Sequence, residues 1–316
     1  MMSNLQVVTG AGPVGWTVAE QLADAGHDVR VLTRSGSGPD HPRIERRRVD
    51  VSDPAALAPA LHGATAVFHC IHGSAYDARV WERELPAAEQ VVLDAAGRIG
   101  AVVVFPESLY SYGRPDGPMT EDGPRAATTG KLGVRTRLLA ARAAHPTPTV
   151  SVVASDFFGP HVRGAHAGER MVPSVLNGRT IRVMGRADVA HSFTYVPDLA
   201  AAMIAAAHDP DRWDSVLHAP TAPAVTQRQM VEAFAKAAQV PAPTVGTLPG
   251  WALRAVGAVH RPTRELAETL YQFEAPFVMD SQRSEQLLGL EPTALDDAAA
   301  ATVRWWRSEM ATPAAR

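Results

Sequence analysis

Cysteine is almost missing from this sequence. The chain contains one cysteine, Cys70, in 316 residues, and a single thiol excludes an internal disulfide. This usage is typical of a reducing compartment. The N-terminal stretch MMSNLQVVTGAG lacks the charged and apolar regions of a signal peptide, and the most apolar later stretch, 199–207, is far too short to span a bilayer. We therefore expect a cytoplasmic protein with no membrane partner.

A strong charge of either sign is also missing. The 30 basic and 33 acidic side chains leave a net charge of −3, and no long basic run interrupts the mixture. Such a chain has no field for a polyanion, so we expect no nucleic-acid partner. Lysine is scarcer still, because Lys131 and Lys236 are the two lysines and every other basic residue is arginine. One of the two stands in the small, polar stretch AATTGK at 126–131.

Clusters of metal ligands are missing as well. His69, Cys70 and His72 are close in sequence, but neighbouring side chains of a strand point to opposite faces. No further cluster of cysteine and histidine follows, so we expect no metal site. The motifs H-E-x-x-H and G-x-S-x-G are absent too, which argues against a zinc protease or an α/β-hydrolase.

What the first half does contain is an alternation of apolar runs and helical patterns. A content of 46% apolar and 20% charged residues is that of a globular protein. Strands are predicted at 6–9, 29–33, 46–51, 66–70, 101–105 and 149–154. Helices are predicted at 13–25, from 52 onward, at 77–97 and at 126–144. Six strands with helical crossovers predict an α/β fold, a Rossmann-type doubly wound parallel sheet.

The second half is less regular and predicts a smaller α/β lobe that shapes a substrate pocket. Helices are predicted at 198–208, 226–239, 263–273, 281–288 and 295–309, with short strands near 180–184 and 216–219. There is no low-complexity linker between the halves. We therefore expect a dinucleotide-binding domain over 1–155 and a substrate-binding lobe over 156–316, partly interleaved with the first.

The stretch TGAGPVG at 9–15 is the strongest chemical signal. It holds Gly10, Gly12 and Gly15 in the spacing G-x-G-x-x-G, with Pro13 and Val14 opening the predicted helix. The first glycine allows a tight turn, the second lets the backbone approach a pyrophosphate, and the third lets helix and strand pack closely. The anion then lies on the helix N-terminus, where free N–H groups favour it.

The end of the second strand predicts which dinucleotide is bound. An NAD site usually places an acidic residue about 20 residues past the glycines, to bond the ribose 2′-hydroxyl. Here the strand ends at Arg34 without an acid, and a guanidinium suits a 2′-phosphate. This favours NADP over NAD, with a merely solvated arginine as the alternative. Asp50 and Val51, which end the third predicted strand, are placed to border the adenine.

At FPESLYSYG (105–113) the chain resembles the extended short-chain dehydrogenase/reductases, the superfamily of NAD-dependent epimerase/dehydratases and their atypical relatives. The resemblance spans nearly the full length. It is carried by TGAGPVG, DVSDPAAL (50–57), VFHC (67–70), SLYSYG (108–113), SDFFGP (155–160) and HSFTYVPDLA (191–200). The glycine-rich turn is one residue shorter than the T-G-x-x-G-x-x-G of extended members, which points to an atypical branch.

The resemblance implies roles for particular residues. Ser108 would lie beside the reacting carbonyl, and Lys131 would be the lysine of Tyr-x-x-x-Lys that binds the nicotinamide ribose. The tyrosine of that motif maps to Ala127, so the expected proton donor is absent. Tyr110 could donate from the facing loop, a water on Ser108 could relay the proton, or no hydride chemistry occurs. Losing such a donor typically forfeits roughly 10²–10⁴-fold in rate.

Position in the family also implies further contacts and partners. Cofactor contacts are expected from Cys70, Asp156 and Phe157. Substrate contacts are expected from Tyr112, Phe158, His191 and Tyr195. The resemblance implies a homodimer through the helices at 77–97 and 126–144. The leading hypothesis is an atypical NADP-dependent oxidoreductase acting on a carbonyl, alcohol or imine group of a small organic substrate. The alternatives are an NAD-dependent sugar-type epimerase or dehydratase, and a catalytically silent NADP-binding regulator.

Overall fold

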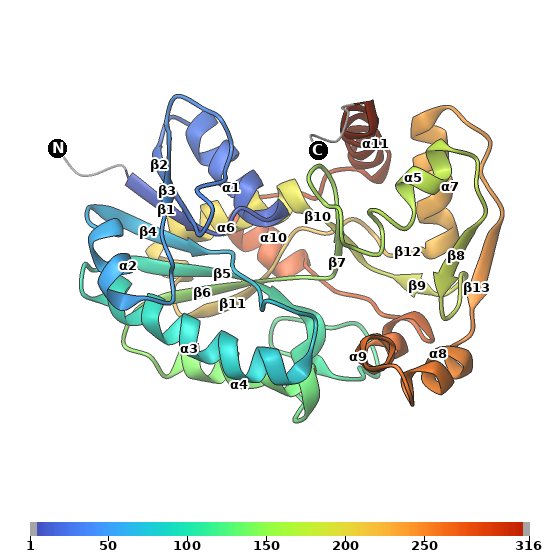
Figure 1. Cartoon of the computed structure of the whole chain (residues 1–316), viewed down its shortest axis with the longest axis horizontal. Helices are drawn as coiled ribbons and strands as arrows, with labels where there is room; N and C mark the ends of the chain where they lie inside the picture. The colour runs from blue at the N-terminus through green and yellow to red at the C-terminus, as the bar shows by residue number, and fades with distance from the viewer. Residues whose placement is uncertain (1–4, 312–316) are drawn as a thin grey trace.

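A seven-stranded parallel sheet forms the centre of the molecule, as the computed structural model shows (Figure 1). Its strands lie in the order β11-β6-β5-β4-β1-β2-β3. The order runs outward from β1 in both directions, so the crossovers reverse between β1 and β4. The structure describes residues 5–311. Residues 1–4, which begin the stretch predicted to lack a signal peptide, and residues 312–316, which end the second predicted domain, lie outside the described residues.

The strands are short, and most are apolar because helices cover both faces of the sheet. They are β1 (Leu5–Thr9), β2 (Asp28–Thr33), β3 (Ile44–Arg48), β4 (Ala64–His69), β5 (Val102–Ser108), β6 (Thr149–Ala154) and β11 (Ser215–His218). All six residues of β6 are buried, whereas β3, at the sheet edge, reads IERRR and is largely exposed. Charges on an edge strand discourage pairing with another chain.

Two helical layers sandwich the sheet (Figure 1). One layer consists of α1 (Pro13–Asp24) and α6 (Val196–Ala207), which pack on each other and on the strands. The other consists of α2 (Pro54–Ala60), α3 (Ala78–Gly97) and α4 (Gly130–Ala143). Each layer closes its own apolar core, with Leu22, Phe68 and Met203 in the first and Leu57 and Phe105 in the second.

The predicted Rossmann-type α/β fold is confirmed, and the structure adds one strand to its sheet. All six strands predicted for the first half are present, although the third lies at Ile44–Arg48 rather than 46–51. The seventh is β11, predicted as a short strand near 216–219, which pairs in parallel with β6. A four-residue apolar run does not encode its pairing partner, so its place in the sheet was not predictable.

The remaining elements form a smaller lobe beside the sheet (Figure 1). Three helices pack around a strand pair in its core. These are α5 (Val172–Leu176), α7 (Gln227–Ala238) and α11 (Leu295–Ala311), with β8 (Ile181–Met184) parallel to β13 (Val245–Leu248). Two short pairs connect the lobe to the sheet region. They are β7 (Asp156–Phe158) with β10 (Phe193–Tyr195), and β9 (Ala190–His191) with β12 (Val225–Thr226).

A helical hairpin of α8 (Gly250–Gly257) and α9 (Arg261–Glu268) projects from this lobe. The single helix predicted at 263–273 is in fact α9 followed by a separate 3-10 turn, Leu270–Phe273. Next come α10 (Gln282–Leu288) and α11. Helices α5 and α8 were not predicted, because one is a single short turn and the other begins and ends at glycine. Within residues 5–311, no helix combines the length and apolarity that crossing a membrane requires.

Candidate functional site

The carboxyl ends of β4, β5 and β6 meet at one edge of the sheet. Residues 70–77 follow β4, Ser108 ends β5 and is followed by the 3-10 turn Leu109–Tyr112, and Asp156 follows β6. The glycine-rich turn after β1 lies beside β4 at the same edge. Ligands of doubly wound sheets bind at this edge, near the reversal of strand order. Most of the predicted site residues are therefore brought to one surface.

The glycine-rich turn has the backbone shape that its sequence predicts. Gly10 has φ +87°, in the left-handed region that favours glycine. A Cβ on Gly15 would overlap the carbonyl oxygen of Gly10, so α1 packs closely on the turn. Pro13 starts α1, Val14 is buried behind it, and Gly12 faces open space where a Cβ would lie. No described side chain caps the first turn of α1, which leaves its N–H groups available to an anion.

A cavity of about 480 Å³ opens at this turn. Gly12 and Trp16 line one side, and His161, Arg163 and Trp305 from the second lobe line the other. The His161 ring stacks on the Trp16 ring with centroids 5.2 Å apart. The volume is in the ordinary range for a small-molecule site. Helix N–H groups on one side and the Arg163 guanidinium on the other fit the pyrophosphate of a dinucleotide. Glu309 also lines the cavity and pairs with Arg163 at 2.6 Å, so the pyrophosphate would share or replace this partner.

Arg34 directly follows β2 and is exposed. The N–H of Gly10 donates to the carbonyl oxygen of Leu32 at 2.9 Å, so this arginine lies two residues from a direct contact of the glycine-rich turn. The hydroxyls of Ser35 and Ser37 beside it are 2.8 Å apart. Residues 33–38 thus offer a guanidinium and hydroxyl groups, and no carboxylate, at the place where the adenosine ribose is expected.

Asp50 and Val51 follow β3, next to this arginine-bearing loop. Val51 is buried, and Asp50 is exposed. Hydrogen bonds from the side chain and backbone of Ser52, with a smaller effect of the Arg34 charge, lower the pKa of Asp50. The Asp50 carboxylate is therefore ionised and already accepts hydrogen bonds from Ser52. Of the two residues, Val51 supplies the apolar side chain.

Cys70 lies beneath the glycine-rich turn. The N–H of Cys70 donates to the carbonyl oxygen of Thr9 at 2.9 Å. A Cβ on Gly10 would lie only 2.9 Å from the carbonyl oxygen of Cys70. Burial raises the pKa of the Cys70 thiol, and burial also lowers the pKa of His69 to about 4. Both groups are neutral. Among residues 5–311, no three histidine, cysteine or acidic side chains gather closely enough to hold a metal ion.

Ser108 is anchored by a buried charge network. Its N–H donates to Oε1 of Glu107 at 2.7 Å, and its hydroxyl is 3.4 Å from the same oxygen. The Glu107 side chain is fully buried and pairs with Arg142 at 2.8 Å and Arg135 at 3.5 Å. Buried pairs of this kind hold their geometry because breaking one leaves an uncompensated charge. The network fixes the backbone of Ser108 at the end of β5.

Tyr110, the candidate proton donor, is bonded to a second tyrosine that the sequence analysis missed. Its hydroxyl lies 2.8 Å from the hydroxyl of Tyr76, which in turn lies 3.3 Å from the Thr269 hydroxyl. Tyr110 is partly buried and its ring stacks on Trp81, whereas Tyr76 is 38% exposed. Burial raises the pKa of Tyr110 well above its usual value. Tyr76 is therefore the more accessible of the two phenols.

Lys131 is fully buried, and its ammonium is enclosed by α9. Nζ donates to Oε2 of Glu265 and to Oε2 of Glu268, each at 2.5 Å, and to the carbonyl oxygen of Glu265 at 3.0 Å. Burial lowers the pKa of Lys131, but the bonds to the two carboxylates outweigh it and leave the pKa raised. Three acceptors match the three donors of an ammonium. Ala127 is buried four residues earlier, where its N–H donates to Ser111.

The same two carboxylates attach α9 to the starts of two helices. Glu265 also accepts from the N–H of Ala78, the first residue of α3, at 3.1 Å. Arg261 pairs at 2.6 Å with Asp77, which directly precedes Ala78 at the start of α3. Glu268 accepts from the N–H of Lys131 at the start of α4, at 3.0 Å. Negative groups are stabilised at helix N-termini, so α9 is held by charge against both helices.

Asp156 and His191 form a pair rather than two separate contacts. Nε2 of His191 lies 2.7 Å from Oδ2 of Asp156, and the imidazole is fully buried between Phe273 and Phe277. Burial raises the pKa of Asp156, but the bond and charge of His191 outweigh it and leave the pKa lowered. The hydrogen bond from the buried imidazole fixes the orientation of the Asp156 carboxylate. Phe157 is half-buried and packs against the sheet core.

Tyr112, expected near the substrate, is buried at the far side of the 3-10 turn. Its hydroxyl donates to the carbonyl oxygen of Thr120 at 2.5 Å and lies 2.7 Å from Nε2 of His218 on β11. Burial raises the pKa of Tyr112 to about 12. The residue thus links the turn to the edge strand of the sheet.

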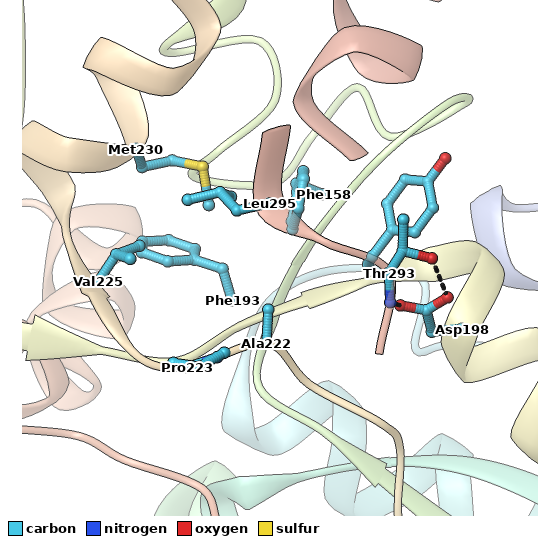
Figure 2. Close-up of a pocket in the computed structure, with 10 residues that line it drawn as sticks. Phe158, Phe193, Asp198, Ala222, Pro223, Val225, Met230, Thr293 and Leu295 are labelled. Carbon is cyan, nitrogen blue, oxygen red and sulfur yellow. Dashed lines mark hydrogen bonds between the residues drawn. The ribbon is translucent and has the colours of Figure 1, made fainter. Parts of the chain in front are cut away.

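Phe158 and Tyr195 line a small cavity of about 10 Å³ between the sheet and the second lobe. Figure 2 shows Phe158 at this cavity. Asp198 accepts from the hydroxyl of Thr293 at 2.7 Å and from its N–H at 2.8 Å, which ties α6 to the segment before α11. The volume is about that of one water. These two aromatic residues are placed between the lobes, away from the 480 Å³ cavity at the glycine-rich turn.

Sequence analysis therefore missed Tyr76, Glu265, Glu268 and Arg163. Tyr76 carries a readable signal, since it lies in the loop after a central strand, where ligands of such sheets bind. The two glutamates carry none, because they meet Lys131 across 134 and 137 residues of sequence. Arg163 follows the FFGP stretch without a distinguishing pattern.

Comparison with known families matches residues 6–217 to the NAD dependent epimerase/dehydratase family. No curated protein matches the sequence. The fold is shared with UDP-glucose 4-epimerase from Thermotoga maritima in complex with UDP-glucose, at 17% identity and a TM-score of 0.76, covering 97% of this chain and 99% of that one.

Two further solved structures resemble the chain over the same extent. The Bordetella bronchiseptica enzyme WbmH, in complex with NAD⁺, has 20% identity and a TM-score of 0.74. MoeE5, in complex with UDP-glucose and NAD, has 22% identity and a TM-score of 0.73. Each comparison covers 97% of this chain and 99% of the other. At such identities the likeness establishes a common fold.

Proposed function

The chain belongs to the NAD-dependent epimerase/dehydratase family, and on this premise we propose that it is an NADP-dependent oxidoreductase acting on a carbonyl, alcohol or imine group of a small organic substrate. The observation that carries the choice of NADP is Arg34. It follows β2 beside Ser35 and Ser37, without a carboxylate in residues 33–38. A carboxylate there would repel a 2′-phosphate, whereas a guanidinium donates two hydrogen bonds to it.

The residues at the glycine-rich turn fit such a cofactor. Gly12 leaves the space that a Cβ would fill, and Arg163 lines the adjoining cavity of about 480 Å³. The open N–H groups of α1 would hold the pyrophosphate, Arg163 would add a cation, and Asp50 and Val51 would border the adenine. The bound dinucleotide supplies or accepts the hydride.

Ser108 and the two tyrosine hydroxyls would serve the reacting carbonyl. Ser108 ends β5 with its backbone fixed by the buried Glu107, so its hydroxyl can donate to the carbonyl oxygen. Tyr110 follows two residues later, and its hydroxyl bonds to that of Tyr76. Asp156, oriented by His191, borders the same edge. Their shared position at the carboxyl edge of the sheet supports a role beside the nicotinamide.

The proposed role of Lys131 at the nicotinamide ribose requires a movement of α9. All three donors of its ammonium are bonded to Glu265 and Glu268, and the side chain is fully buried. A ribose hydroxyl can reach this ammonium only when α9 moves away. Without that movement, Lys131 acts as a positive charge 4.6 Å from the ring centroid of Tyr76.

Two other functions are each favoured by one observation. UDP-glucose appears with the similar structures of MoeE5 and the Thermotoga maritima epimerase, which favours an NAD-dependent sugar epimerase or dehydratase. Arg34 argues against it. The enclosure of Lys131 by α9, together with Ala127 in place of tyrosine, favours a catalytically silent NADP-binding regulator.

Cofactor binding and turnover separate the three. If the protein is a reductase, calorimetry should show tighter binding of NADPH than of NADH. NADPH should also be oxidised with at least one member of a panel of aldehydes, ketones and imines. Preference for NADH together with interconversion of UDP-sugars would establish the epimerase. Tight NADPH binding without any turnover would establish the regulator. The homodimer implied by the family, through α3 and α4, is tested by light scattering of the eluted protein.

A further inference from the structure

Three hydroxyl groups form a chain at the carboxyl edge of the sheet. The Tyr76 hydroxyl lies 2.8 Å from that of Tyr110 and 3.3 Å from that of Thr269. Thr269 is buried and Tyr110 is partly buried under Trp81, whereas Tyr76 is 38% exposed. Tyr76 is therefore the residue of the three with the largest exposed fraction, and its hydroxyl joins the other two.

A positive charge lies directly against the Tyr76 ring. Nζ of Lys131 is 4.6 Å from the ring centroid, where it would stabilise negative charge on the phenol. Burial raises the pKa of Tyr76, and the bonds to Thr269 and Tyr110 and the Lys131 charge offset this only in part. The phenol is thus protonated at neutral pH. The other titratable or charged groups around it are Glu265, Glu268, Asp156, Tyr110 and Tyr271.

We propose that Tyr76 is the proton donor of the reaction and takes the place of the phenol that Ala127 lacks. The inference rests on the proposed function, reduction by NADPH. In the reducing direction, the carbonyl carbon gains a hydride from NADPH while the carbonyl oxygen takes the hydroxyl proton of Tyr76. The products are the alcohol, NADP⁺ and a phenolate. The phenolate then takes a proton from solvent and becomes the phenol again. Each turnover therefore consumes one proton from solvent.

The surroundings of Tyr76 suit this role better than those of Tyr110. The phenolate left on Tyr76 would accept hydrogen bonds from Tyr110 and Thr269 and face the Lys131 ammonium. Hydrogen bonds to a charged group are typically worth about 1.5–3 kcal/mol. Around Tyr110, by contrast, burial and then the neighbouring Tyr76 and Asp156 hold the pKa well above its usual value. Tyr110 is therefore a positioning residue that acts through Tyr76.

The test uses the full-length protein and three single variants and, for the titration, double variants that add Tyr76→Phe to each of the other two. Tyr76→Phe removes the donor, Tyr110→Phe removes its supporting hydroxyl, and Tyr271→Phe is the control, since the Tyr271 hydroxyl bonds to Gln272 instead. Each is assayed for NADPH oxidation with the carbonyl panel and for NADPH affinity by calorimetry. A readout independent of turnover is the alkaline ultraviolet titration of tyrosine in the protein without cofactor, taken as the difference between each protein and its Tyr76→Phe counterpart.

We expect Tyr76→Phe to lose about 10²–10⁴-fold in turnover with NADPH affinity unchanged. Tyr110→Phe should lose about 10-fold and raise the titration midpoint of Tyr76 by about one pH unit. Tyr271→Phe should match the unmodified protein.

Two results would overturn the donor role of Tyr76, a third would overturn the supporting role of Tyr110, and the three are distinguishable. Full turnover in Tyr76→Phe removes the donor role and leaves the reductase function standing. An unchanged Tyr76 midpoint in Tyr110→Phe removes the supporting role of Tyr110. If the unmodified protein binds NADPH but reduces no carbonyl, the proposed function fails, and the donor role fails with it.

Discussion

Glu268 accepts two hydrogen bonds from Lys131, one from the backbone N–H at 3.0 Å and one from the ammonium at 2.5 Å. The two residues are 137 positions apart. Their contact joins the end of α9 to the start of α4, so the scarce lysine is the anchor of a long-range tertiary contact. The carboxylate also lies at the positive end of the α4 dipole.

Replacing Lys131 by methionine should destabilise the protein by about 3 kcal/mol, because Glu265 and Glu268 would face each other without their shared cation. The control is Lys236→Met. Its partner Asp296 lies at the same 2.5 Å, but both side chains are largely exposed, so its loss should cost about 0–1 kcal/mol. Urea unfolding measures the free energy of unfolding of both variants. Equal costs for the two variants would show that α9 does not depend on the ammonium.

Gly130→Ala should loosen α9 from α4. A Cβ at this position would overlap the Glu268 carboxylate, and the backbone φ of +60° is unfavourable for alanine. Gly178→Ala is a matched control, since Gly178 has φ +62° with open space around it. The backbone cost alone is about 1–2 kcal/mol, which both variants share. Hydrogen exchange should therefore rise over 250–269 in Gly130→Ala alone, and a rise in both variants would contradict the contact.

Arg34→Ala should weaken NADPH binding by about 10- to 100-fold, since a charge-assisted bond to phosphate is worth about 1.5–3 kcal/mol. NADH affinity should change by less than about 2-fold because NADH has no 2′-phosphate. Arg43→Ala, at the opposite end of β3 and paired with Asp28, should affect neither. Calorimetry with both dinucleotides measures the change. An equal loss for NADPH and NADH would show that Arg34 contacts a group common to both.

Arg163→Ala should weaken NADPH and NADH equally, by about 2- to 10-fold, because it faces the cavity at the glycine-rich turn, where the shared pyrophosphate would lie. Its carboxylate partner provides the control. Glu309→Gln removes the ion pair at 2.6 Å but keeps the guanidinium, so affinity should be retained or improved. A loss in Glu309→Gln as large as in Arg163→Ala would indicate that the ion pair only maintains the loop.

Local patterns predicted the sheet and the glycine-rich turn because both depend on neighbours in sequence. Buried parallel strands appear as apolar runs, and the roles of Gly10 and Gly15 follow from their spacing. The boundary errors have local causes. Residues 50–51 belong to the turn after β3, and the predicted helix at 263–273 breaks where Thr269 leaves helical geometry at ψ 2°.

The arrangement of the candidate site was not predictable in the same way. Lys131 is held by residues of α9, and Tyr76 meets Tyr110 and Thr269 from two other segments. These contacts depend on how the α8–α9 hairpin folds back over the sheet edge, and hydrophobic periodicity does not contain that information. The roles of Ser108, Lys131 and the cofactor residues stay predictions, of which the Arg34 and Arg163 variants test the cofactor contacts.

The place of β11 has a consequence for synthesis of the chain. β6 is buried along its whole length and borders β11 on one side, but β11 begins at Ser215, 61 residues after β6 ends at Ala154. Helix α6, which covers the sheet from one face, also lies in that interval. A nascent chain that has emerged only as far as β6 therefore exposes a strand edge and an apolar sheet face to solvent. Ribosome pausing between these two points would favour aggregation over folding.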